Sequence, residues 1–207
     1  MNKQNTIVVA VDGPSASGKS TVSRRTAAAV GWIYVDSGAL YRGVTWKCVK
    51  EGIDVKDAQA VTNLLIKMNF QLTCNGEAVG YLIDGEDPGM EIRGEAVRAR
   101  VADIAAQQPV RVFIVDKLRQ MTKLGNLVME GRDIGTVVIP YSPFKYYLDA
   151  DPAERARRRH ADSPSAKATA TSPRFSTPSR LATRRIPTAR PPRCRLPSAP
   201  RSSTAPE

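Results

Sequence analysis

The segment Gly13-Pro14-Ser15-Ala16-Ser17-Gly18-Lys19-Ser20 constrains the fold more than any other part of this 207-residue chain. It starts two residues after the apolar run 6–11, whose pattern predicts a short buried strand. The alanine-containing segment 21–30 behind it predicts a helix. A glycine at each end of the segment lets the backbone bend tightly between strand and helix. Successive N–H groups and the positive end of the helix dipole then point at one place. The sequence therefore predicts a strand, loop and helix that enclose an oligophosphate.

The same eight residues form the complete pattern G-x-x-x-x-G-K-[ST] of a phosphate loop. We expect every residue from Gly13 to Ser20, and Thr21 after them, to contact the phosphates. Lys19 is predicted to reach the β- and γ-phosphates, which makes it a candidate catalytic residue. The Ser20 hydroxyl is predicted to hold Mg²⁺.

Composition narrows the class of protein. The length suits one α/β domain with a small insertion, and no stretch is long and apolar enough to cross a membrane. The amino terminus leads into the first strand without a signal-peptide pattern, and the three cysteines have no C-x-x-C spacing, so we expect a cytoplasmic protein. The single histidine, His160, disfavours Ser-His-Asp catalysis and His-rich zinc sites.

The net charge of +11 is unevenly distributed along the chain. Up to Asp162 there are 22 Lys and Arg against 19 Asp and Glu, a net charge of +3; beyond it there are 9 against 1, a net charge of +8. The excess of positive charge therefore belongs to the carboxyl-terminal segment, and nucleic-acid binding by the rest of the chain is not expected.

Apolar spacing predicts strands that alternate with helices. Strands are expected at 32–35, 127–129 and 145–148, and helices at 39–50, 57–68, 95–105, 110–121 and 152–159. Two further short strands at 70–74 and 79–83 read as a hairpin within an insertion of about residues 53–92. The alternation predicts an α/β fold with a parallel sheet flanked by helices.

Polar clusters follow the predicted strands, at the sheet edge where parallel α/β folds bind ligands. They are Asp36-Ser37-Gly38 with Tyr41 and Arg42; Arg93 with Arg111; and Arg132-Asp133. Arginine suits phosphate because its planar guanidinium binds two oxygens and keeps its charge. Together with the phosphate loop, the clusters favour a second, phosphorylated ligand, although each arginine alone is also compatible with a solvated surface ion pair.

Several motifs resemble those of bacterial cytidylate kinases. The similar segments are Val11-Asp12-Gly13-Pro14-Ser15, Asp36-Ser37-Gly38-Ala39-Leu40-Tyr41-Arg42, Glu91-Ile92-Arg93, Glu130-Gly131-Arg132-Asp133-Ile134-Gly135-Thr136-Val137-Val138, Leu148-Asp149-Ala150-Asp151 and Glu154-Arg155-Ala156-Arg157-Arg158-Arg159. They occur in the family's order and spacing from about Thr6 to Arg159.

The resemblance implies a nucleoside monophosphate kinase with a phosphate-loop core, a monophosphate-binding insertion and a mobile lid. It implies transfer of the γ-phosphoryl group of ATP, with Mg²⁺, to CMP or dCMP, by a monomer that acts in pyrimidine nucleotide metabolism. By position, Ser37, Arg42, Arg111 and Asp133 would bind the acceptor, with Arg93 and Arg132 as further candidates. Arg155, Arg158 and Arg159 would approach the transferring phosphate. The alternative interpretation of this arginine run is one solvated helix face.

The resemblance stops at residue 160. Residues 163–207 contain nine of the fifteen prolines and hardly any aliphatic residue, a composition that cannot form a core strand and helix and that predicts disorder. Cytidylate kinases continue instead with R-D-x-x-D-[ST]-x-R, A-P-L and L-D-S-T. If the codons from Leu181 onward are read one base out of phase, they permit these motifs at the family's spacing. Our hypothesis is therefore a frameshifted lid and an incomplete kinase domain at 1–159, with weak ATP binding, low stability and little activity.

Two other functions remain open from the sequence. One is another phosphate-loop kinase, for UMP, AMP or a small alcohol. The other is a nucleotide-dependent nucleic-acid-binding protein that uses the basic segment 160–207, whose arginines would contact phosphates.

Overall fold

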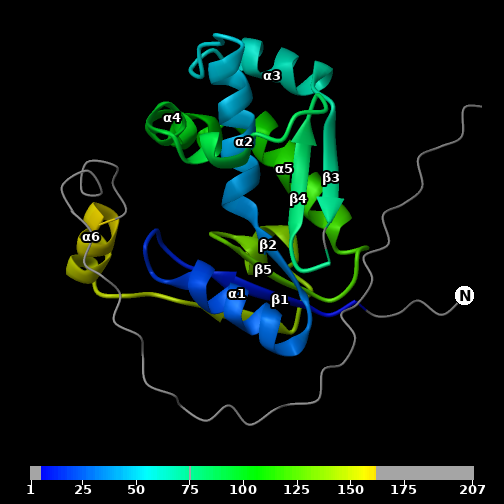
Figure 1. Ribbon diagram of the computed structural model, residues 1–207, viewed down its shortest axis with the longest axis vertical. Helices are drawn as coiled ribbons and strands as arrows, with labels where there is room; N and C mark the ends of the chain where they lie inside the picture. Colours follow the sequence, from blue (N-terminus) through cyan, green and yellow to red (C-terminus); the bar gives the residue numbers. More distant parts are fainter. Residues whose placement is uncertain (1–5, 75, 162–207) are drawn as a thin grey trace, which may run out of the picture.

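The computed structural model describes residues 6–74 and 76–161 (Figure 1). The strands are β1 (Val8–Asp12), β2 (Ile33–Asp36), β3 (Phe70–Cys74), β4 (Val79–Ile83), β5 (Leu127–Gly131) and β6 (Phe144–Tyr147). The helices are α1 (Lys19–Val30), α2 (Ser37–Lys50), α3 (Ala58–Lys67), α4 (Glu95–Ala106), α5 (Gln108–Met121) and α6 (Pro152–Ala161). A 3₁₀-helix, η1 (Gly89–Arg93), precedes α4, and a π-helix, η2 (Ile134–Val138), follows β5.

The main sheet has four parallel strands in the order β2-β5-β1-β6. Asp12, the last residue of β1, pairs with Gly131 on β5 and with Tyr147 on β6, while Asp36 of β2 pairs with Glu130. All four strands therefore end along one edge, directly beside the segment 13–20. The predicted parallel sheet flanked by helices is confirmed.

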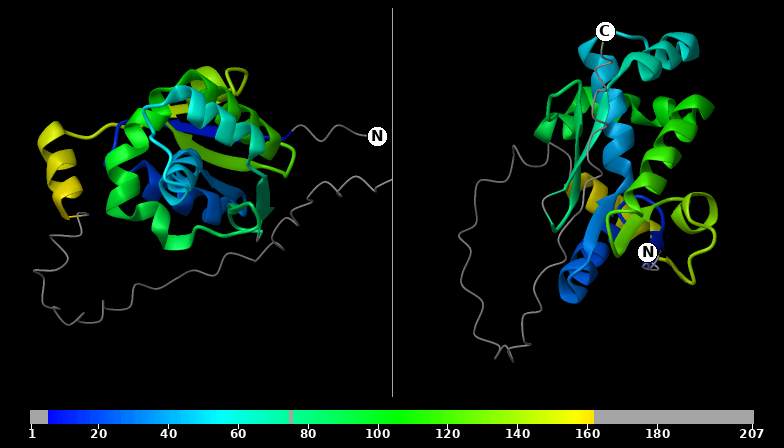
Figure 2. Two further views of the ribbon diagram at one scale, coloured as in Figure 1. Left: turned by 90° about the horizontal axis from the view of Figure 1, so that it is seen from above. Right: turned by 90° about the vertical axis from the view of Figure 1, so that its right-hand side faces the viewer.

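Side-chain alternation along β1 divides the interior into two layers. Val8 and Ala10 point into the larger apolar cluster, which the helices α2, α4 and α5 cover, whereas Val11 packs with Ala27 of α1 on the other face. Figure 2 shows the backbone from two further directions. The helix that follows the phosphate loop is therefore packed directly against the strands.

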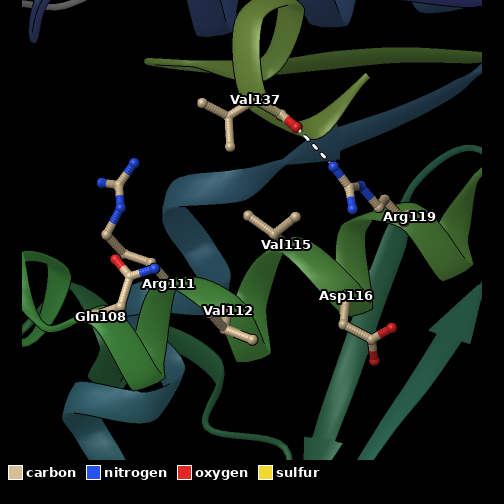
Figure 3. Close-up of a pocket in the computed structure, with 7 residues that line it drawn as sticks. All are labelled: Gln108, Arg111, Val112, Val115, Asp116, Arg119 and Val137. Carbon is tan, nitrogen blue, oxygen red and sulfur yellow. Dashed lines mark hydrogen bonds between the residues drawn. The ribbon is translucent and has the colours of Figure 1, made fainter. Parts of the chain in front are cut away.

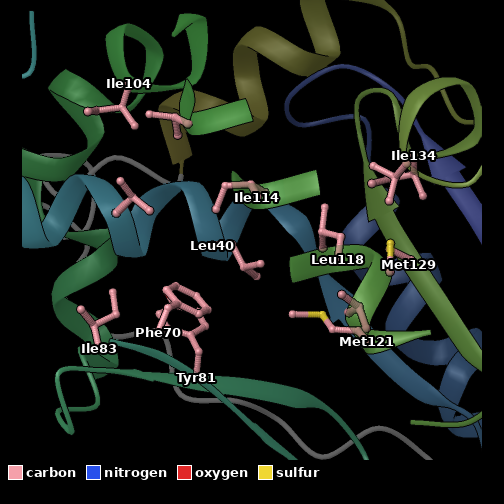
Figure 4. Packing of buried hydrophobic residues seen from close by; sticks show 14 of the residues in the cluster. Leu40, Phe70, Tyr81, Ile83, Ile104, Ile114, Leu118, Met121, Met129 and Ile134 are labelled. Carbon is pink, nitrogen blue, oxygen red and sulfur yellow. The ribbon is translucent and has the colours of Figure 1, made fainter. Parts of the chain in front are cut away.

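The hairpin of β3 and β4 is antiparallel, as predicted, and shares the larger cluster. Phe70 stacks on Tyr81 with ring centroids 4.9 Å apart, and Phe113 of α5 meets Phe70 edge to face at 5.7 Å. Figure 4 shows Phe70 and Tyr81 beside Leu40 of α2. The boundaries of an insertion at 53–92 remain a prediction.

The two short helical turns η1 and η2 were not predicted. The five residues of η2, Ile134-Gly135-Thr136-Val137-Val138, have no polar face of helical period, and their turn is held by contacts distant in sequence. Helix α2 begins at Ser37 rather than at Ala39, because the Asp36 side chain accepts a hydrogen bond from the Ala39 N–H and caps the helix. Strand β6 lies one residue earlier than predicted.

Within the part of the chain that the structure describes, no helix combines the length and apolar character that a membrane crossing requires. Helix α6 ends at Ala161, so it includes His160. The predictions for the rest of the segment 160–207 lie outside the described residues.

Candidate active site

The segment Gly13–Ser20 curves from the end of β1 to the start of α1. Gly13 has φ 153°, and a Cβ there would lie 2.1 Å from the Leu148 carbonyl oxygen. Gly18 has φ 95° and caps α1 without a side-chain hydrogen bond. Only glycine therefore fits at position 13. At the start of α1, no side chain occupies the first-turn N–H groups, so they keep their capacity to bind an anion.

Lys19 lies in the first turn of α1, and its Nζ donates a hydrogen bond to the Pro14 carbonyl oxygen at 3.1 Å. Burial lowers the pKa of the Lys19 ammonium, and the negative charge of Glu130 acts in the opposite direction. The lysine is thus folded back over the loop, where it is partly desolvated. The negative charge of a bound phosphate would stabilise its protonated form.

The two predicted ligand serines of the loop, Ser17 and Ser20, differ in burial. Ser17 is buried, and its Oγ has no hydrogen-bond partner within the described residues, which is costly unless a ligand supplies one. Ser20 is exposed at the first turn of α1. The described residues contain no cluster of three or more His, Cys, Asp or Glu that could hold a metal. The Ser20 hydroxyl would offer one protein oxygen, which fits Mg²⁺, because this ion keeps several waters and completes its coordination with substrate phosphates.

Ser37 and the end of β5 lie in contact. Ser37 is buried, and a Cβ on Gly131 would lie 2.6 Å from the Ser37 Oγ. The predicted first and third polar clusters therefore meet at one point of the sheet edge.

Arg42 is one turn further along α2. Its Nη2 pairs with the Asp36 carboxylate at 2.8 Å, while its buried Nε has no hydrogen-bond partner among the described residues. Arg42 is thus anchored at one end and keeps a donor that an anionic ligand could use.

Arg111 of α5 and Asp133 form an ion pair through Arg111 Nη2. Tyr41 lies beside this pair: burial raises the pKa of its hydroxyl, the Asp133 charge raises it further and the Arg111 charge lowers it. Helix α2, helix α5 and the turn after β5 therefore each contribute one polar side chain to the same place. The sequence predicted Arg111 and Asp133 as site residues and named Tyr41 only as a neighbour of Ser37.

Arg111 also lines a cavity of about 280 Å³ along the outer side of α5 (Figure 3). Val112 and Val115 form part of its wall, and Arg119 closes the far end by donating to the Val137 and Val138 carbonyls. The cavity therefore adjoins the ion pair of Arg111 with Asp133 and is bounded by η2.

Arg132 and Arg93 are less tightly placed. Arg132 is exposed directly before Asp133, and its charge lowers the pKa of Lys19, which places it near the phosphate loop. Arg93 is exposed on η1, and no hydrogen bond or ion pair within residues 6–74 and 76–161 joins it to the other predicted site residues. The electrostatic effect on Lys19 supports Arg132 as a site residue, whereas the role of Arg93 stays a prediction.

The arginines of α6 differ from one another. Arg158 donates from Nη1 to the Ala16 carbonyl of the phosphate loop at 3.3 Å and from Nε to Glu154 at 2.7 Å. Arg155 turns back to Ala150 and Asp149, and Arg159 is exposed. Of the three, Arg158 is the one in contact with the loop.

Glu130 is a candidate site residue that the sequence analysis did not single out. It is 2% exposed at the end of β5 and accepts a hydrogen bond from the Tyr34 hydroxyl. Burial, together with the charges of Asp36 and Glu130, raises the pKa of Tyr34. The sequence signal for Glu130 was a carboxylate at the end of an otherwise apolar strand. Glu130 was missed because the apolar pattern of that strand indicates only a part of the buried core.

Comparisons with known proteins agree on one family. The family model described as "Cytidylate kinase" matches residues 9–175, a range that continues past the last quoted motif into residues outside the described part. The cytidylate kinase of Geobacillus kaustophilus is 41% identical over 156 residues, covering 75% of this chain and 70% of that protein. The one from Caldanaerobacter subterraneus is 40% identical over 157 residues, covering 76% and 68%.

A bifunctional pantoate ligase/cytidylate kinase of Synechococcus elongatus is 45% identical over 160 residues. That match covers 75% of this chain, which spans only 30% of the bifunctional protein. Since the family model covers most of the chain and the single-function relatives match over similar lengths, the chain belongs to the cytidylate kinase family.

Proposed function

We propose that this protein transfers the γ-phosphoryl group of ATP to CMP and dCMP, giving ADP and CDP or dCDP. The observation that carries the proposal is the phosphate loop facing Arg111, Asp133 and Tyr41 across one sheet edge, in a chain of the cytidylate kinase family. The names of the relatives support the same acceptor and do not favour the alternative functions.

The donor binds at the phosphate loop. Backbone N–H groups of residues 13–20 and the first turn of α1, with Thr21 behind them, surround the phosphates. Lys19 leaves the Pro14 carbonyl and pairs with the β- and γ-phosphates. Ser20 would hold Mg²⁺, which supplies neutralisation of phosphate charge.

The acceptor binds along the strand ends. Arg42 and Arg111 pair with its phosphate and base, Asp133 lies near the sugar hydroxyls, and Ser37 contributes its hydroxyl. Arg93 and Arg132 remain further candidates. These positions orient a phosphate oxygen of CMP toward the γ-phosphorus, so that the new P–O bond forms as the bond to the ADP oxygen breaks.

Arg158 supplies positive charge at the transferring phosphate, with Arg155 and Arg159 as further candidates on the same helix. The hydrogen bond between Arg158 and Ala16 already places its guanidinium at the rim of the loop. Charge that spreads over the equatorial oxygens during transfer is stabilised by such a cation.

The test is ADP release, measured with ATP and Mg²⁺ in the presence of CMP, dCMP, UMP or AMP. We expect release with CMP and dCMP to exceed release with UMP and AMP, because the relatives are named cytidylate kinases and Arg111 and Asp133 are proposed to contact the base and the sugar. Equal or faster release with UMP or AMP would reject the proposed acceptor. Release that is independent of any acceptor would indicate an ATPase.

We also propose that the protein is a cytoplasmic monomer that requires ATP and Mg²⁺. Sedimentation of the full chain would test the monomer, and loss of ADP release on chelation of divalent ions, restored by added Mg²⁺, would test the metal requirement.

A further inference from the structure

Asp12, the last residue of β1, makes two hydrogen bonds across the sheet edge that the reaction scheme above does not use. Its side chain accepts from the Ile134 N–H at Oδ1, 2.7 Å, and from the Gly135 N–H at Oδ2, 2.9 Å. The residue is only 8% exposed. Both carboxylate oxygens of a buried aspartate are thus occupied by main-chain donors that lie more than 120 residues away.

These two donors are the first N–H groups of η2. The first N–H groups of a helical turn have no partner inside the turn, and burying them unpaired is costly. Asp133 comes directly before them, and its carbonyl oxygen accepts from the Val137 and Val138 N–H groups. Asp133 is therefore held by η2, and η2 is held by Asp12.

The space around this contact is limited. A Cβ on Gly135 would lie 3.3 Å from the Asp12 Oδ2 and 3.1 Å from Lys145 Cγ. A glycine at position 135 lets the η2 backbone approach the carboxylate closely. The main chain of Asp12 also accepts from the Leu148 N–H at 2.8 Å, so this residue joins β1 to the segment that leads into α6.

Asp12 immediately precedes Gly13, the first residue of the phosphate loop. One side chain therefore connects the donor loop to the acceptor residue Asp133 through two charge-assisted hydrogen bonds. The alternative explanation is that Asp12 only stabilises the fold.

We propose that Asp12 is a positioning residue that fixes Asp133 relative to the phosphate loop and thereby sets the affinity for the acceptor nucleotide. This inference rests on the proposed function, because it assumes that Asp133 contacts the acceptor. It predicts an effect on acceptor binding that a purely structural role would not produce.

The first experiment is the variant Asp12→Asn, which keeps the shape but replaces one acceptor oxygen by an NH₂ group. Loss of a charge-assisted hydrogen bond predicts a rise in acceptor KM of about 10-fold or more. The Kd for ATP, measured by binding without acceptor, is expected to stay unchanged. An equal loss of affinity for both nucleotides, or none for CMP, would overturn the proposal.

Double variants with Asp133→Asn show whether Asp12 acts through Asp133. If it does, Asp12→Asn raises the acceptor KM much less in the Asp133→Asn background than in the unchanged chain. Fully additive effects would contradict the proposal. The matched control is Ser142→Ala, which removes a buried hydroxyl that ties the other end of β1 to the loop before β6 and should leave both affinities unchanged.

Hydrogen exchange provides a readout that does not depend on activity. In the unchanged chain the Ile134 and Gly135 amides should exchange slowly, and in Asp12→Asn at least one should exchange faster while the β5 amides remain protected. Unaltered exchange at both amides would refute the positioning role even if the kinase assay fails. Absence of ADP release with every acceptor, together with the expected exchange pattern, would instead reject the proposed function alone.

If Asp12→Asn does not fold, Gly135→Ala tests the same contact from the opposite side. The added methyl presses on the Asp12 carboxylate and on a flexible lysine stem, so we expect a smaller rise in acceptor KM with the ATP Kd unchanged. No change in acceptor KM in this variant would count against the proposal.

Discussion

At the scale of single residues, Lys19 shows how one side chain can serve function at the expense of stability. Its pKa is lowered, chiefly by burial, so the folded state favours the neutral form more than the unfolded chain does. Such a group destabilises the folded protein wherever the unfolded lysine is protonated, which is at pH values below its ordinary pKa of 10.5 and therefore at neutral pH. The cost of burying the Lys19 ammonium is therefore offset when a negatively charged ligand binds.

We predict that Lys19→Met lowers kcat by about 100-fold or more, as expected when a group that stabilises transition-state charge is removed. The same variant should leave Tm unchanged or raise it, because a partly desolvated ammonium is replaced by an apolar chain of similar length. Steady-state kinetics and thermal unfolding measure the two effects. Lys123→Met, an exposed lysine after α5, is the control and should change neither. A marked fall in Tm in Lys19→Met would show that the lysine stabilises the fold.

At the scale of elements, α6 is held near the phosphate loop by its own charges. Glu154 accepts from Arg157 and from Arg158, and Arg158 in turn reaches the loop. Glu154 thus orients the cation proposed to act at the transferring phosphate.

The hydrogen bonds from Arg157 and Arg158 lower the pKa of Glu154 from its ordinary value to about 2. Because the folded pKa is depressed, the contribution of Glu154 is present above the unfolded pKa and is lost as the pH falls toward 2. We therefore predict that the Glu154 carboxyl titrates near pH 2 in a carbon NMR titration. Replacing both arginines by Gln should return the midpoint toward the ordinary value, whereas Arg100→Gln on α4 should not move it. A midpoint at the ordinary value in the unchanged chain would contradict the ion pairs.

One of the contacts between the β3-β4 hairpin and α2 is a hydrogen bond from a tyrosine hydroxyl. Tyr81 donates to the Ala39 carbonyl at 2.6 Å, and its ring lies against Gly43 and Phe70. This contact joins the hairpin to the helix that presents Ser37 and Arg42.

We predict that Tyr81→Phe destabilises the protein by about 1 kcal/mol, the contribution of one buried hydrogen bond. For a chain of this size, that free energy corresponds to a fall in Tm of roughly 2–4 °C. Tyr147→Phe on the exposed side of β6 makes the same chemical change and should leave Tm unaltered. Equal shifts in the two variants would show that the Tyr81 hydroxyl contributes nothing specific.

At the scale of the whole molecule, the parts that the sequence could predict are those with local signals. The phosphate loop, the strand ends and the parallel sheet follow from short patterns, because chain direction alone places Asp36 and Asp133 at one edge. The pairing of Asp12 with η2 and of Tyr34 with Glu130 could not be predicted, since each joins residues about a hundred positions apart. The role of Arg93 stays a prediction, because its motif favours the site while its exposed side chain makes no hydrogen bond or ion pair to the other predicted site residues in the described part of the chain.

The last prediction concerns the basic segment 163–207, whose composition and codon phase suggest a frameshifted lid. If the segment replaces a lid, the chain lacks cations that would approach the transferring phosphate and cannot exclude water from it. We predict that the full chain binds ATP weakly and releases ADP slowly, and that a version with the shifted frame restored gains in both. The restored protein should use the same phosphate-loop lysine, because restoring the frame does not change the contacts of Lys19 and Arg111. Lys19→Met in the restored protein should therefore abolish the gain in ADP release. Resequencing the coding DNA around codon 160 tests the origin directly. An intact frame with near-normal turnover of the 207-residue chain would sink the frameshift hypothesis and leave the basic segment as a functional part of the protein.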